Sequence, residues 1–139
     1  MLDVKSNELI KKQLLNHLRE LNKLKLNIDE YLIWGSSVLA IRGYRIARDL
    51  DIVVTKKCWE KLTKSYVVEG EKLNVIRIKN IEIWNDLLNL TDKLDLVMKD
   101  KDVIEGYPFL KLKYTLEWKE FLHREKDITD IQLIEELLK

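Results

Sequence analysis

The chain has 139 residues, of which 25 are basic and 24 are acidic, so its formal net charge is only +1. This balance excludes a bulk electrostatic attraction to nucleic acid or to an anionic membrane, although a local basic patch remains compatible with it. The length predicts one domain, and a hydrophobic content of 46% is enough for a buried core. The single cysteine, Cys58, excludes an intramolecular disulfide and a cysteine-rich zinc site.

The sequence carries no sign of a membrane segment. No apolar run approaches the length of a membrane-spanning helix. The first residues, MLDVKSNELIKK, lack the apolar core of a secretion signal. We therefore expect a cytoplasmic protein without a membrane partner.

The first expected element is an amphipathic helix over 6–24, where apolar residues recur at spacings of four, four and three. In chain order, the further expected elements are a strand over 30–34, a short helix over 36–42 that Gly43 ends, a strand over 49–54, a helix over 56–64, extended segments over 65–84, a helix or loop over 86–105, an extended segment over 107–112, and helices over 115–124 and 128–138. Within 65–84, the sequence VIRI-KN-IEIW predicts a tight hairpin.

This order of elements predicts the α/β or α+β class, with a mixed β-sheet flanked by helices. The whole chain, 1–139, is expected to form one small domain. Its core spans 30–112, between the N-terminal helix and the C-terminal helices over 115–138.

Asp49 and Asp51 stand one residue apart at the start of the strand expected over 49–54. Side chains at i and i+2 of a strand share a face, which places the two carboxylates about 7 Å apart. Carboxylates this close raise each other's pKa unless a cation lies between them, and their oxygen atoms suit Mg²⁺. The alternative is a solvated acidic pair at a strand end.

The expected hairpin supplies a third acid, Glu82. Around its two-residue turn, Arg77 faces Glu82, and Glu82 shares a face with Trp84. If this strand pairs beside 49–54, Glu82 joins the two aspartates, and three carboxylates can hold two metal ions. The alternatives are an exposed cross-strand ion pair between Glu82 and Arg77 and, for Trp84, a packed position, which we favour over base stacking.

Two parts of the chain together carry a resemblance. The Trp34-Gly35-Ser36 turn, a short helix and Asp49-Leu50-Asp51 on the next strand resemble the signature of the polymerase-β-type nucleotidyltransferase superfamily. The stretch EWKEFLHREKDITDIQLIEELL resembles the ending of small stand-alone members, a group that includes abortive-infection-type toxins and minimal nucleotidyltransferases. The matching residues there are Lys119, Arg124, Lys126, Asp127 and Asp130. In this chain Ser36 replaces the second glycine of many members.

The resemblance implies a nucleotidyltransferase-like fold and a Mg²⁺-dependent transfer of a nucleoside monophosphate from an NTP to an acceptor hydroxyl. The implied catalytic residues and ligands of two Mg²⁺ ions are Asp49, Asp51 and Glu82. The implied contacts to the triphosphate come from Gly35, Ser36, Ser37, Lys119 and Lys126.

Several of these side chains have a plain structural alternative. Ser36 and Ser37 are candidates to cap the helix that begins there. Thr115 and Asp127 are candidate caps of the C-terminal helices, and for Asp127 we favour the cap over a role as an active-site acid.

Three arginines lie between the Gly35-Ser36 turn and the Asp49-Leu50-Asp51 strand, and their roles stay open. Arg42 and Arg45 can reach a phosphate or an aspartate, but a solvated or structural role is favoured for both. Arg48 directly precedes Asp49, so in a strand it points away from the metal ligands.

A second class of function stays open beside the enzyme. A protein with this fold can act as a regulatory, antitoxin-like module with a helical protein partner or a second copy of itself, or as a degenerate member that binds nucleotide without turnover. For the enzyme, the acceptor is equally open: a small molecule, an RNA end or a protein side chain all suit this chemistry.

Overall fold

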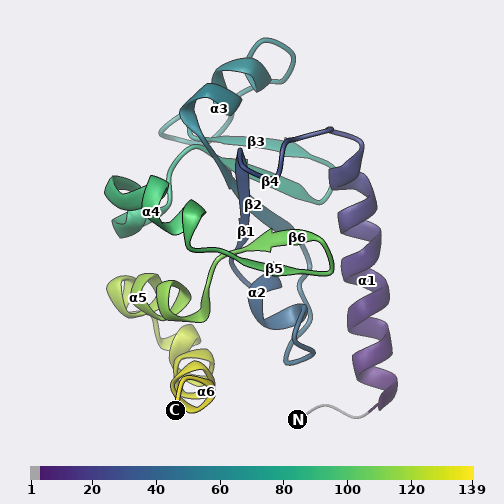
Figure 1. The fold of residues 1–139 in the computed structure, drawn as a ribbon, viewed down its shortest axis with the longest axis vertical. Helices are drawn as coiled ribbons and strands as arrows, with labels where there is room; N and C mark the ends of the chain where they lie inside the picture. Colours follow the sequence, from purple (N-terminus) through teal and green to yellow (C-terminus); the bar gives the residue numbers. More distant parts are fainter. Residues whose placement is uncertain (1–3) are drawn as a thin grey trace.

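A computed structural model describes the backbone of residues 4–139 and the side chains from residue 8 onwards. The chain forms one α+β domain, as the order of elements in the sequence predicts (Figure 1). Its elements are α1 (Val4–Asn22), β1 (Tyr31–Trp34), α2 (Ser37–Ala40), β2 (Leu50–Val54), α3 (Lys56–Leu62), β3 (Val75–Ile78), β4 (Ile81–Trp84), the 3₁₀ helix η1 (Leu88–Lys93), α4 (Leu94–Lys99), β5 (Asp102–Ile104), β6 (Tyr107–Phe109), α5 (Leu112–Leu122), the 3₁₀ helix η2 (Glu125–Asp127) and α6 (Ile128–Leu137).

The strands form one mixed sheet in the order β3-β4-β2-β1-β6-β5. The hairpins β3–β4 and β5–β6 are antiparallel, as is the central pair β1–β2, whereas β2 pairs with β4 and β1 with β6 in parallel. Figure 1 shows α1 on one side of this sheet and α4, α5 and α6 on the other. None of the described helices combines the length and apolar character needed to cross a membrane.

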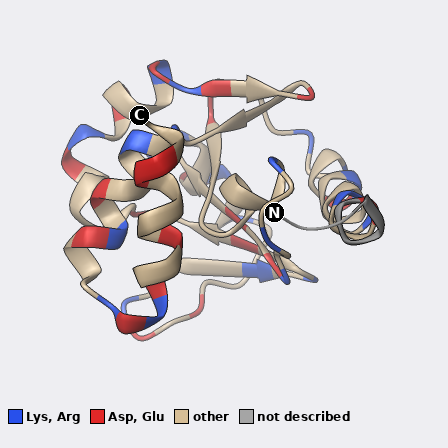
Figure 2. Ribbon diagram, turned by 90° about the horizontal axis from the view of Figure 1, so that it is seen from below, with Lys and Arg blue, Asp and Glu red and all other residues tan. Residues whose placement is uncertain are grey.

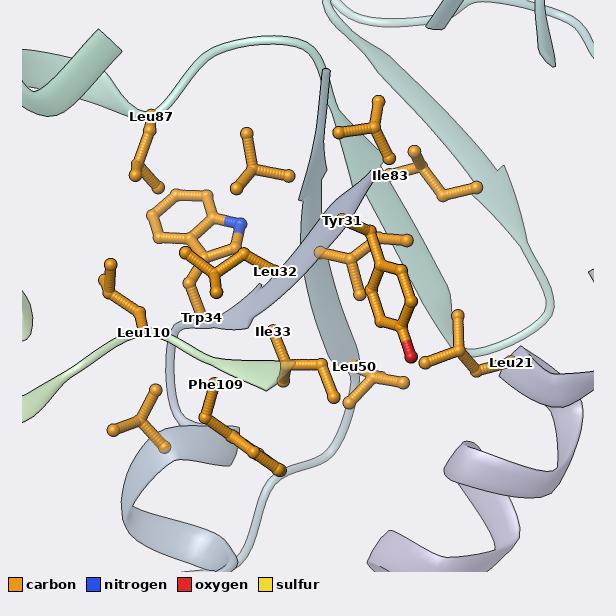
Figure 3. Packing of buried hydrophobic residues seen from close by; sticks show 14 of the residues in the cluster. Leu21, Tyr31, Leu32, Ile33, Trp34, Leu50, Ile83, Leu87, Phe109 and Leu110 are labelled. Carbon is orange, nitrogen blue, oxygen red and sulfur yellow. The ribbon is translucent and has the colours of Figure 1, made fainter. Parts of the chain in front are cut away.

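The two faces of the sheet differ because side chains alternate along each strand. On the α1 side, Tyr31 packs beside Leu21 of α1, and Ile33 lies beside Phe109 (Figure 3). On the opposite face, Trp34 packs against Leu87 from the segment that follows β4. The apolar stripe that the sequence predicts for the first helix is buried against this core and comprises Ile10, Leu14, Leu18 and Leu21.

The hairpin that the sequence predicts around Lys79-Asn80 is confirmed, because β3 and β4 pair antiparallel across these two residues. Lys79 takes a positive φ of 54°, which such tight turns require. The hairpin then pairs in parallel with β2, as the sequence interpretation requires for its third acid.

Three expectations differ from the structure. The segment 65–74 holds only an isolated bridge between Glu69 and Val75, since Gly70 and Leu73 adopt positive φ angles that turn the chain. The segment 86–105 is neither one helix nor a loop but contains η1, α4 and β5. α5 already begins at Leu112, so Thr115 is no cap, and its hydroxyl donates to the carbonyl of Lys111 within the helix.

Candidate functional site

A cleft of about 720 Å³ opens on the sheet face that carries Trp34, Asp51 and Trp84. Its other walls come from the segment before β3, from β3 itself, and from α5 and η2. The cationic residues of the lining are Arg45, Lys72, Arg77, Lys119, Arg124 and Lys126, and the acidic ones are Asp51, Glu71, Asp86 and Asp127. Basic and acidic residues are interspersed over the molecule as a whole (Figure 2), so the cationic excess of the cleft is local.

A second hollow of about 460 Å³ adjoins the first. Ser36, Arg45 and Asp51 border both hollows. Asp49 and Arg48 border only the second, together with the exposed Ile46. The two aspartates of the Asp-x-Asp motif therefore face a common space.

Asp51 is the most buried acid of the motif. It lies on β2 opposite Trp34 of β1, and its Oδ1 accepts a hydrogen bond of 3.1 Å from the indole N–H of Trp84. Burial raises the pKa of Asp51 to about 6; the Trp84 hydrogen bond acts in the opposite direction, and the charges of Glu82 and Asp49 add to the rise. No cationic side chain among the described residues forms an ion pair with Asp51, so its charge is uncompensated.

Glu82 lies in register with Asp51 on the adjacent parallel strand, and side chains at such a pair share a face. Its other neighbour is Arg77 of β3, whose Nε is 3.9 Å from the Glu82 carboxylate. Burial raises the pKa of Glu82, Arg77 lowers it, and the charge of Asp49 raises it further. The pairing with Arg77 that the sequence offers as an alternative is thus present, but it is long and leaves the Glu82 carboxylate half-buried beside Asp51.

Asp49 lies in a bend directly before β2 rather than in the strand, and it is exposed. β2 begins at Leu50, where pairing with the β4 segment begins: the N–H of Leu50 donates to the carbonyl of Asn80, the residue before β4. Arg48 lies in the same bend and borders the second hollow with Asp49 and Asp51. The prediction that Arg48 points away from the acids is therefore wrong, since it presupposed a strand at this position.

Gly35 holds the turn against the catalytic candidate Asp51. Its φ is +72°, and a Cβ at this position would lie 2.7 Å from the Asp51 Oδ2. Both the backbone angle and the close approach therefore require glycine. The following Ser36 borders both hollows, and its side chain makes no capping hydrogen bond to α2.

Ser37 is the one predicted triphosphate contact that the structure keeps out of the cleft. All residues of α2 are buried, and Ser37 is 0% exposed, with a hydroxyl that has no hydrogen-bond partner among the described residues. It neither borders a hollow nor caps the helix, so both of its expected roles are absent from this structure.

The C-terminal motif forms a buried ion network at the end of the cleft. Lys119 is only 3% exposed, and its Nζ lies 2.9 Å from Asp127 and 3.3 Å from Asp130. Asp127 also receives a hydrogen bond of 2.6 Å from the Nε of Arg124. Burial acts to raise the pKa of Asp127, but the hydrogen bonds from Arg124 and Lys119 outweigh it, and the pKa is lowered.

This network changes the interpretation of two predicted residues. Asp127 precedes α6 without a side-chain capping bond, so the favoured cap is wrong; the carboxylate binds cations of α5 and its adjoining turn instead. Lys119 borders the cleft, but its ammonium is paired with carboxylates. Lys126, by contrast, is an exposed cleft residue without an ion pair among the described side chains.

The arginines of the first motif take separate positions. Arg42 donates to the carbonyl of Val38 at 2.7 Å and pairs with Asp102 of β5 at 3.1 Å, which confirms its structural role. Arg45 pairs with Asp130 and borders both hollows, so it links the first motif to the C-terminal one.

The residues around Asp51 suit a hard divalent cation. The side chains of Asp49, Asp51 and Glu82 offer only oxygen atoms, the ligands that Mg²⁺ prefers, and two of them carry raised pKa values. Burial is the main cause of both rises and the mutual repulsion of the acids adds to it; a bound cation favours the charged form of each carboxylate against both effects. In the part of the chain whose side chains are described, no group of three His, Cys, Asp or Glu residues forms a ready-made metal centre.

Sequence reasoning missed several residues of the cleft. Trp34 and Trp118 are both at least nine-tenths buried, but both also border the cleft and pack edge-to-face with ring centroids 5.4 Å apart. Asp86 was not singled out, although it follows Glu82 and Trp84 at the same two-residue spacing. Lys72 lies in an irregular segment, where no periodic signal exists.

Fold and cleft together define a small α+β protein whose candidate active site is an acidic pair on neighbouring strands beside a glycine-serine turn. Comparison with family models, with curated proteins and with solved structures finds no match for this chain.

Proposed function

We propose that this protein is a Mg²⁺-dependent nucleotidyltransferase that moves a nucleoside monophosphate from an NTP to an acceptor hydroxyl. The observation that carries the proposal is the register of Asp51 with Glu82 on neighbouring parallel strands, directly beside Gly35 and Ser36. An acidic pair that lacks a strong cationic partner, next to a cleft with a cationic excess, is complementary to a metal-bound polyphosphate.

In this proposal Asp49, Asp51 and Glu82 hold up to two Mg²⁺ ions, which supply charge neutralisation for the attacking and leaving oxygens. Ser36 contacts the triphosphate from the turn, and Lys126 provides an unpaired positive charge from the other wall of the cleft.

The bond balance is that of a simple displacement. The acceptor oxygen forms a bond to the α-phosphorus, the bond from the α-phosphorus to the bridging oxygen breaks, and pyrophosphate leaves. The acceptor's proton goes to water or to a carboxylate that holds no metal ion, and Glu82 is the candidate base where it is not a metal ligand. The remaining contribution of the protein is to position the two substrates and to stabilise the charge that develops.

Binding of a non-hydrolysable NTP analogue, measured by calorimetry with Mg²⁺ and with EDTA, tests the proposal without knowledge of the acceptor. We expect binding that requires Mg²⁺ and is lost in Asp51→Asn and in Glu82→Gln. The matched control is Asp92→Asn, which removes one exposed carboxylate outside the cleft. Equal affinity in EDTA, or in Asp51→Asn, would refute the proposal.

The catalytic step is tested with an α-labelled NTP and three acceptor classes, namely tRNA, an unfolded protein and small polyhydroxylated compounds. Label transfer is expected for one class and is expected to disappear in Asp51→Asn. Mg²⁺-dependent binding without transfer to any class would favour the nucleotide-binding, non-catalytic alternative. We place the reaction in the cytoplasm, where NTPs and Mg²⁺ are abundant.

The alternative of action through a protein partner has one observation in its favour. Phe121 near the end of α5 and Ile128 at the start of α6 are 58% and 50% exposed, beside the turn that carries Lys126. Contiguous exposed apolar patches are typical of docking surfaces, and these two side chains flank one turn of the chain. Light scattering of the purified protein, alone and after co-expression with the products of the genes that adjoin its own, distinguishes a monomer from a homodimer or a complex with a helical partner.

A further inference from the structure

The end of the cleft beyond Trp84 has the chemistry of a nucleobase subsite. At this end of the hairpin, Val75 of β3 and Trp84 of β4 form the last pair of the ladder. One further backbone hydrogen bond follows, from the N–H of Asn85 to the carbonyl of Asn74 at 3.2 Å. The side chain of the next residue, Asp86, reaches that of Asn74, with the Asn74 Nδ2 3.4 Å from the Asp86 Oδ1, and both residues border the cleft. Asn74 and Asp86 thus lie in irregular segments directly beyond the β3–β4 ladder.

The side chains of Asn74 and Asp86 leave most of their hydrogen-bonding capacity free. Their mutual contact, from the Asn74 Nδ2 to the Asp86 Oδ1, is long at 3.4 Å. Asp86 forms no ion pair among the described residues, so its carboxylate oxygens remain available as acceptors, and the Asn74 amide has a second N–H to donate. The cleft wall thus presents an amide N–H donor beside two carboxylate oxygens, and the Asn74 Oδ1 is a further acceptor.

Trp84 lies between this pair and the acidic site. Its indole N–H is bonded to Asp51, and Trp34 packs edge-to-face on the ring with centroids 6.2 Å apart, so the ring position is fixed. From Glu82, which is opposite Asp51, to Asp86 the chain advances four residues, or at most about 13 Å at the rise of a strand. This is the length scale of an extended nucleoside monophosphate, with the phosphate at Asp51 and the base beyond Trp84.

From this juxtaposition we infer that Asn74 and Asp86 form a base-recognition site selective for guanine, with Trp84 as the stacking platform. Guanine presents an acceptor, O6, beside two donors, N1–H and the exocyclic amino group, and this is the complement of one amide donor and two carboxylate oxygens. Adenine and cytosine place a ring nitrogen acceptor against the carboxylate, and uracil offers one N–H flanked by two carbonyls. Aromatic stacking adds affinity for any base and does not discriminate.

This inference rests on the proposed function, because it assigns the base of the same NTP. Calorimetry with the α,β-methylene analogues of GTP, ATP, CTP and UTP in Mg²⁺ measures the preference without turnover. We expect the GTP analogue to bind about ten- to a hundredfold more tightly than the others, the value of one or two hydrogen bonds to a charged group. The ITP analogue, which lacks the exocyclic amino group, is expected to fall between.

The variant Asp86→Asn removes one charge at constant shape and is expected to reduce the preference to within about threefold, while Asp92→Asn preserves it. Four analogues that bind the unaltered protein equally, or a preference for another base, would overturn the inference and leave the proposed function in place. An equal loss for all analogues in Asp86→Asn would also overturn it, since the carboxylate would then bind the ribose. If no analogue binds in Mg²⁺, the proposed function itself fails.

Discussion

Replacing Asp51 by asparagine should make the folded protein more stable at neutral pH. Asp51 has a pKa of about 6 in the folded state against an ordinary value of 3.8, chiefly because burial disfavours its charge. A shift of about two units corresponds to about 3 kcal/mol, at 1.36 kcal/mol per unit. This is an upper limit because Asp51 keeps partial exposure. Asparagine retains the oxygen that accepts the Trp84 N–H and lacks the charge.

The sign of the pH dependence follows from linkage. A carboxyl whose pKa is raised on folding contributes stability below its unfolded pKa, and this contribution is lost as the pH rises through the folded value. The gain in the free energy of unfolding of Asp51→Asn over the parent should therefore be near its maximum above pH 6 and vanish below pH 3.8. Urea unfolding followed by fluorescence of the four tryptophans gives the free energy at each pH.

Two controls sharpen this measurement. Asp92→Asn, at an exposed carboxylate, should change the free energy by less than about 0.5 kcal/mol at every pH. Added Mg²⁺ should stabilise the unaltered protein by mass action and leave Asp51→Asn unaffected. An Asp51→Asn protein that is less stable than the parent at pH 8 would show that its charge is compensated, and the argument for a cation at this site would fail.

Three further substitutions test other contacts of the site. Gly35→Ala should lower the free energy of unfolding, measured in urea, by at least about 1 kcal/mol more than Gly106→Ala does. Both positions have a positive φ, but only a Cβ at position 35 would meet Asp51. Equal losses in the two variants would remove the steric reason for a glycine at position 35. Lys119→Met should cost about 3–5 kcal/mol by the same assay, since it strands a buried carboxylate, and a neutral result would show that the network is solvated. Trp84→Phe deletes the donor to Asp51 and should raise the pKa of that carboxyl above 6, measured by NMR titration; a lower pKa would contradict the assigned hydrogen bond.

Much of the fold was predictable because its signals are local. The period of the apolar residues places the buried face of α1, and two residues with turn chemistry set the β3–β4 register, so that Arg77 faces Glu82. From this register alone, Glu82 and Trp84 share a face. The same two-residue spacing continues to Asp86, so this residue was within reach of the sequence pattern.

The remaining features depend on contacts between distant segments. Asp49 looks like a strand residue by its neighbours, but β2 begins only where β4 begins to pair with it. Ser37 resembles a cap by type, yet α2 is covered on all sides and the hydroxyl is buried. The partners of Asp127 could not be read from the sequence either, since a cap and a buried ion pair use the same residue type at a helix start.

The buried network also explains why the two sequence motifs occur together in one cleft. Burying Lys119 and Asp127 costs desolvation energy, and such pairs seldom add net stability relative to apolar residues. The network around Lys119 instead fixes the positions of cations. Asp127 binds Arg124, and Asp130 binds Arg45, which is 85 residues away in the sequence. Two guanidinium-bearing residues that border the cleft are therefore held by buried or partly buried carboxylates. In the proposed reaction the C-terminal motif therefore orients cations toward the polyphosphate, and the direct phosphate contact falls to the unpaired Lys126.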